Sequence, residues 1–127
     1  MDNLTGIERL AEVLALRATH ARTVLAGIQA QENRLRMALK ALERPARPEP
    51  DHDEEEDRSL RNAEVELRWQ RWAEARRIAL QFELAQVLAR KADAKRAVAR
   101  AIGKEAALAA VVIDAKTKAH RKRARRQ

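Results

Sequence analysis

The residue types that most often carry enzyme chemistry are sparse in this sequence and are not spaced to act together. The three histidines, His20, His52 and His120, are far apart, and none has a second histidine one helical turn away, as a two-histidine zinc site on a helix needs. Cysteine is absent, which excludes thiolate metal sites and disulfides. The three glycines are isolated, so no glycine-rich loop exists to hold a nucleotide phosphate. We expect no metal site and no cofactor.

Carboxylate pairs occur, for example Glu8 with Glu12, but acid–base catalysis also needs a cleft that shifts a pKa. The composition predicts solvated helices instead. Charged residues make up 36% of the chain, against about 25% in an average globular domain. Alanine accounts for 27 of the 127 residues, and the other common types are also strong helix formers. We therefore expect a non-enzymatic, helical protein.

Charge is distributed unevenly along the chain. The net charge is +8, but residues 58–127 alone carry 19 basic and 7 acidic groups, a local balance of +12. Such a basic segment attracts nucleic acid, anionic lipid or an acidic protein surface. The longest strongly apolar window, residues 106–113, is too short to span a bilayer, and no signal peptide is visible. These features predict a cytoplasmic protein without a membrane span.

The clearest periodicity lies in the first third of the chain and predicts a helix over residues 3–44. Seam positions follow one another at alternating steps of three and four residues, the pattern of a left-handed coiled coil. They are Leu4, Ile7, Ala11, Leu14, Ala18, Ala21, Leu25, Ile28, Glu32, Leu35, Leu39 and Leu42. Thr5 and Glu8 have the spacing of a capping box at its start. Pro45 predicts its end, because a residue before proline is pushed out of the helical region.

Residues 45–57 predict a connector, since they contain three prolines and an acidic run too charged to fold alone. A second helix is expected over residues 59–120. Its large apolar residues do not fit one strict heptad register. The predicted fold is therefore all-α: two long helices in an antiparallel coiled-coil hairpin, within one domain of residues 1–127. The basic end, residues 116–127, would protrude. Whether the seam closes within one chain or between two is left open.

Helix length predicts a segment without an intrachain partner. About 40 residues of first helix span about 60 Å and would pair with residues 58–100 of the second. Beyond Gly103 an apolar stripe would then lack a partner inside the chain and need one outside it. The residues predicted to dock there are Leu108, Val111, Val112, Ile113, Lys116 and Lys118.

Two further groups of residues are candidates for binding. Trp69 and Trp72 lie among arginines, a composition enriched in binding hot spots, although packing near the hairpin tip explains them as well. The basic tail has no interleaved aromatic residue, so it could contact only the backbone of a nucleic acid, weakly and without sequence preference. The cations of the tail that are predicted to act through their charge are Arg121, Lys122, Arg123, Arg125 and Arg126.

The arrangement of these segments resembles the FliJ family, coiled-coil stalk proteins of flagellar type III secretion. The resemblance lies in a heptad helix, a polar break, a longer second helix with an early Arg-Trp doublet, and a basic C-terminus. In that family large apolar residues follow the doublet six and ten positions on, as Ile78 and Phe82 follow Arg71-Trp72 here. Starting from Arg68-Trp69 the same spacing reaches only alanines.

This resemblance implies a non-enzymatic adaptor of protein export with two partners. Paired helix ends would bind a hexameric export ATPase, and Trp69, Trp72, Ile78 and Phe82 would bind the export gate. The protein would then work in the cytoplasm, peripherally at a membrane-associated apparatus. The alternative is a basic coiled coil that binds nucleic acid, or a scaffold that associates with itself through the heptad seam.

Overall fold

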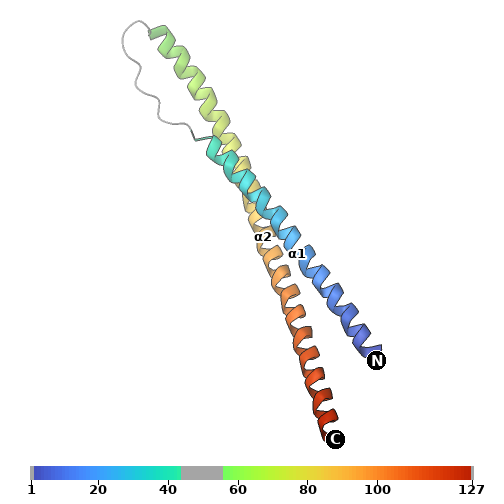
Figure 1. Cartoon of the computed structure of the whole chain (residues 1–127). Coiled ribbons are helices and arrows are strands. Elements are labelled where there is room, and N and C mark those ends of the chain that lie inside the picture. Colours follow the sequence, from blue (N-terminus) through green and yellow to red (C-terminus); the bar gives the residue numbers. More distant parts are fainter. Residues whose placement is uncertain (1, 44–55, 127) are drawn as a thin grey trace. The chain divides into compact units, whose positions relative to one another are not determined.

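Two long α-helices form the structure, a computed structural model that describes residues 2–43 and 56–126. Helix α1 spans Asp2–Ala41 and α2 spans Glu56–Arg126. The side chains of residues 2–4, 56 and 57 are not among those described. The two helices pack against each other as a hairpin, as Figure 1 shows. The all-α helical hairpin expected from the sequence is confirmed.

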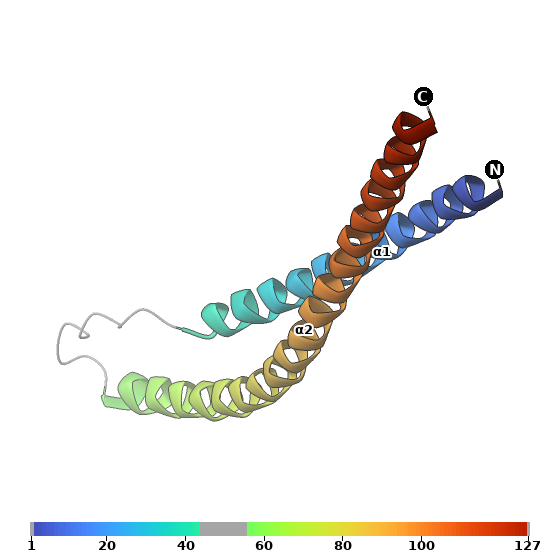
Figure 2. The same ribbon diagram turned by 90° about the horizontal axis from the view of Figure 1, so that it is seen from below.

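Packing divides the hairpin into two units. Residues 30–89 form one unit, here the central unit, and Met1–Gln29 with Arg90–Gln127 form the other, here the terminal unit. In the terminal unit the blue N-terminal part of α1 lies beside the orange and red part of α2 in both views (Figures 1 and 2). The helices of this unit are therefore antiparallel.

The ends of the helices differ by a few residues from those expected. α1 ends at Ala41, where the amides of Leu42 and Glu43 donate to the carbonyls of Leu39 and Lys40, three residues back, which tightens the last turn. At its other end α1 already begins at Asp2. Thr5 and Glu8 therefore lie inside the helix, and the predicted capping box is wrong.

α2 is longer than expected at both ends. It begins at Glu56, inside the predicted connector, and continues to Arg126, six residues past the predicted end at 120. Acidic residues at the start of a helix and basic residues at its end both interact favourably with its dipole, which accounts for this extension. The basic tail is thus helical. Residues 44–55 of the connector lie outside the described residues.

The seam predicted for α1 is confirmed at almost every position. Of the twelve predicted residues, ten are buried or half-buried, Ala11 is exposed, and the side chain of Leu4 is not described. Ala38, which was not predicted, is half-buried beside Leu39. Glu32, the one polar seam residue, is buried, and Arg36 Nε donates to its Oε2 at 2.8 Å. This local ion pair offsets part of the desolvation of the carboxylate.

The seam of α2 is more regular than the sequence suggested. Most of its half-buried and buried positions keep steps of three and four residues, with one extra step of four at Trp69, Ala73 and Arg77. The half-buried Ala92 and Ala97 lie beside this seam. The seam consists of Glu66, Trp69, Ala73, Arg77, Leu80, Leu84, Val87, Lys91, Ala94, Val98, Ala101, Glu105, Leu108 and Val112. An irregular seam was expected because only large apolar residues were considered. Alanines, and charged residues with long aliphatic stems, occupy the remaining positions.

Each unit has a thin core of its own. In the central unit Leu42, Ala73 and Leu80 are buried, and a second group packs around them: Leu35, Ala38, Leu39 and Trp69. In the terminal unit Ala18 is only 1% exposed and Ala94 is buried. Small side chains at these positions allow the helix backbones to approach closely. The same feature leaves little room for a larger residue there.

Candidate docking surfaces

A row of exposed, large apolar side chains follows α2 through the central unit. Its members, here the outer stripe, are Leu60, Leu67, Ile78 and Phe82, and they are 48–67% exposed. Ile78 and Phe82 lie two positions before and after the buried Leu80. Because two residues of an α-helix differ by about 200° around its axis, the stripe lies on the face opposite the seam. It therefore contributes nothing to the hairpin core.

The structure separates the two tryptophans that were predicted to act together. Trp69 is half-buried and packs against the core of Leu42, Ala73 and Leu80, whereas Trp72 is 58% exposed. Trp69 thus serves the hairpin interior, as the packing explanation expected. Trp72 remains available to a partner, together with Ile78 and Phe82.

A shallow hollow and several arginines accompany the exposed side chains. The hollow has a volume of about 410 Å³ and is lined by Leu67, Trp69, Gln70, Arg71, Ala73, Glu74 and Arg77. Arg77 is paired with Glu74 one turn before it. Arg68, Arg71 and Arg76 make no ion pair with another described residue. An apolar centre with unpaired cations around it suits a partner with an apolar patch and an acidic rim.

The apolar segment after Gly103 does not lack a partner, contrary to the expectation from helix length. Leu108 and Val112 are half-buried, while Val111 and Ile113 on the other sides of the same turns are 57% and 66% exposed. The terminal unit contains only one other helix, so α1 covers Leu108 and Val112. The expectation failed because residues 58–65 of α2 are exposed and Glu66 is its first described residue that is half-buried. Leu42, at the end of α1, packs near Ala73 and Leu80.

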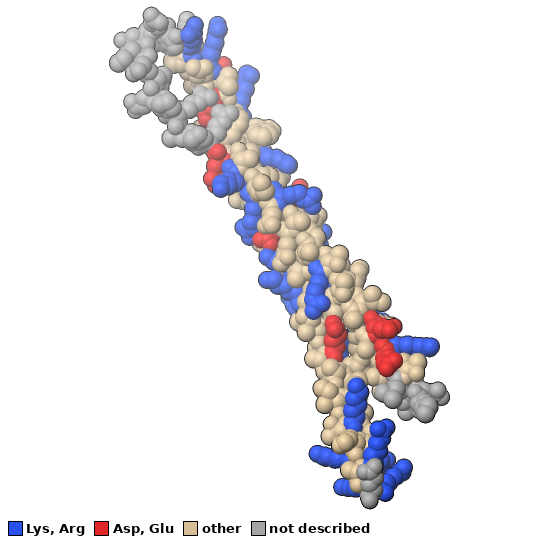
Figure 3. Space-filling view, in the orientation of Figure 1, with Lys and Arg blue, Asp and Glu red and all other residues tan. Residues whose placement is uncertain are grey.

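The predicted ATPase-binding set is therefore split. Val111, Ile113, Lys116 and Lys118 are accessible, whereas Leu108 and Val112 belong to the seam. Every described residue from Ile113 to Arg126 is exposed. Basic side chains gather at this end of the molecule, as Figure 3 shows in blue. The end of α2 thus presents charge rather than apolar surface.

The fold creates no new arrangement among the described residues of the types associated with catalysis. His20 and His120 are exposed, and His52 lies outside the described residues. Among the residues that the structure describes, no group of three histidine, cysteine or acidic side chains could hold a metal ion. Neither described helix contains an apolar stretch long enough to cross a membrane.

Comparison with known proteins adds no relative. No family model matches the sequence, and neither a curated protein nor a solved structure matches it.

Proposed function

We propose that the protein is a non-enzymatic coiled-coil adaptor of the FliJ type, which docks on the gate and the ATPase of a type III export apparatus. The outer stripe of α2 carries this proposal. Together with Trp72 it would contact the export gate. The exposed residues at the end of α2, Val111, Ile113, Lys116 and Lys118, would contact the ATPase.

The exposure of Ile78 and Phe82 is the observation that favours a docking role. Large apolar side chains that face away from the core of a small hairpin cost solubility and contribute no folding energy. Burying one such side chain in a partner contributes about 1.5–3 kcal/mol. A micromolar interaction needs roughly 8 kcal/mol. Burial of Trp72, Ile78 and Phe82 could supply much of it, after the cost of ordering these side chains is subtracted. A rigid helix keeps that cost low.

Binding to purified export proteins encoded by the same genome tests the proposal. The double variant I78S/F82S should bind the cytosolic part of the export gate at least tenfold more weakly, which corresponds to about 1.4 kcal/mol. Its thermal melting should be nearly unchanged, because neither side chain packs in the hairpin. Calorimetric titration gives the affinity, and circular dichroism gives the melting curve.

The matched control is L16S/M37S. Leu16 and Met37 are 70% and 71% exposed on α1, so this variant removes the same amount of exposed apolar surface elsewhere. It should bind the gate as the unchanged protein does. Equal losses in both variants would remove the outer stripe as the docking site, and no binding of the unchanged protein to gate or ATPase would refute the FliJ-type function. If I78S/F82S instead dissociates a homodimer in sedimentation equilibrium, the protein is a self-associating scaffold.

A further inference from the structure

The end of α2 carries a dense cluster of cations with almost no acid to neutralise them. Seven lysines and arginines lie between residues 116 and 126, and the nearest acid in sequence is Asp114. Asp114 Oδ2 lies 3.1 Å from Lys118 Nζ, and no other cation of this segment forms an ion pair with a described residue. The cluster is therefore open to an external anion.

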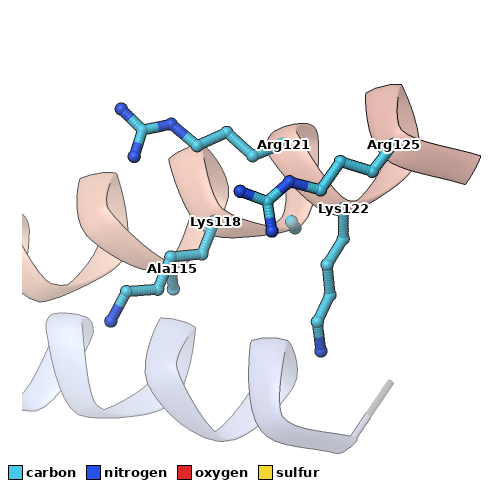
Figure 4. A pocket seen from close by; sticks show the side chains of 6 residues that line it. Ala115, Lys118, Arg121, Lys122 and Arg125 are labelled. Carbon is cyan, nitrogen blue, oxygen red and sulfur yellow. The ribbon is translucent and has the colours of Figure 1, made fainter.

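Four of these cations share one face of the helix. Lys118, Arg121, Lys122 and Arg125 follow one another at steps of three, one and three residues, which places them on one side over two turns. With Ala115 and Ala119 they line a hollow of about 530 Å³. Figure 4 shows Arg121 and Arg125 extending back along α2 in the same direction. We call this surface the four-cation face.

The dimensions of the four-cation face suit a phosphate backbone. Seven helical steps cover about 10 Å. A DNA duplex carries one phosphate charge per roughly 1.7 Å of its axis, so the same length presents about six phosphates. The pair of Lys118 with Asp114 is exposed and therefore weak, so a phosphate can replace Asp114 there. Each of the four cations can then meet one phosphate, and the two guanidinium groups can each bind two phosphate oxygens.

The remaining side chains of the segment argue against the other polyanions. From residue 114 to 126 the only apolar residues are alanines, Ala115, Ala119 and Ala124. A protein interface needs an apolar or aromatic centre, and a helix that lies in a membrane surface buries large apolar side chains. This segment has neither, and it has no phenylalanine, tyrosine or tryptophan to stack on a base.

We propose that the four-cation face binds the phosphate backbone of double-stranded DNA without reading its sequence. This surface belongs to the terminal unit, whereas the outer stripe belongs to the central unit. The variant R121Q/K122Q/R125Q changes none of the residues assigned to the gate or the ATPase, so loss of DNA binding leaves both of those interactions measurable. Binding should be weak and strongly dependent on salt.

Fluorescence anisotropy with a labelled 20-base-pair duplex tests the proposal. Between about 25 and 200 mM NaCl the logarithm of the binding constant should fall with that of the salt concentration, with a slope of about −3.6 for four contacts. The full-length variant R121Q/K122Q/R125Q removes three of them. Its slope should become shallower by about 2.7, because each contact contributes about 0.9. Circular dichroism checks that the helix remains intact.

The control variant R9Q/R17Q/R22Q removes the same charge from exposed positions spread around α1. Its slope should stay within about 0.5 of that of the unchanged protein, well below one contact. An equal change in both variants would show attraction by net charge alone and overturn the proposal, as would no binding at 25 mM salt. If the protein binds one of two unrelated duplexes more than tenfold more tightly than the other, it reads the DNA sequence, which contradicts the proposal.

Two further probes identify the polyanion. Poly-glutamate stands in for an acidic protein, and vesicles containing phosphatidylserine stand in for an anionic membrane. Both should bind more weakly than the duplex at equal ionic strength. Binding of either at least as tight as that of DNA, with the same loss in R121Q/K122Q/R125Q, would assign the four-cation face to that class of partner instead.

Discussion

Replacing Leu80 by alanine should test which face of α2 forms the hairpin core. Leu80 is 2% exposed and packs with Leu42 and Ala73. Leucine-to-alanine changes in protein cores cost about 2–5 kcal/mol. A two-helix hairpin can close part of the cavity, because no third layer holds its helices apart, so we expect the lower end, about 2–3 kcal/mol.

The expected effect on melting follows from the size of the chain. One kcal/mol shifts the midpoint by roughly 3–5 °C at this length, so Leu80→Ala should lower it by about 6–15 °C. Leu60→Ala is the matched control: the change in helix propensity is the same, but Leu60 is 65% exposed. With only about a third of its area buried, its loss should cost about 0.5–1 kcal/mol. Circular dichroism at 222 nm measures both transitions.

Phe82→Ala provides the decisive comparison. A core phenylalanine would cost about 3–5 kcal/mol on truncation, but Phe82 lies in the outer stripe, so its replacement should leave the midpoint within a few degrees. If Phe82→Ala destabilises the protein as much as Leu80→Ala does, the outer stripe is part of a core. The assignment of the seam, and with it the docking proposal, would then be refuted.

Three further predictions follow from other positions of the hairpin. Ala18→Leu should lower stability by about 1–3 kcal/mol, since Ala18 is almost fully buried where the helices approach closely, and unchanged melting would contradict that close approach. Glu105→Leu should raise stability by about 1–3 kcal/mol, because Glu105 Oε1 is buried without a hydrogen-bond partner among the described residues; a lower melting temperature would show that the carboxylate has one. Acrylamide should quench the fluorescence of W69F, which retains the exposed Trp72, more strongly than that of W72F, and equal quenching would contradict the separation of the two side chains.

The candidate docking residues could be found from the sequence only in part. The spacing of Trp72, Ile78 and Phe82 was visible in the sequence, but whether these side chains face the core or solvent was not. An amphipathic helix with apolar residues on two faces has no single hydrophobic direction. A signal was nevertheless present: Ile78 and Phe82 flank Leu80 at two positions, a spacing that cannot place all three on one side of a helix.

The sequence by itself determined the helices and the seam of α1. Helix formation depends on local propensity and on a period of 3.5 residues, both of which can be read from neighbouring positions. Only the tertiary structure decided how far the two helices are offset, and therefore that α1 covers Leu108 and Val112. Within each unit the offset depends on which layers of side chains interlock. Small residues are buried in both, Ala18 in the terminal unit and Ala73 in the central unit. Helix length limits the possible offsets but does not determine one. A connector allows several offsets, and the packing of the seam selects one of them.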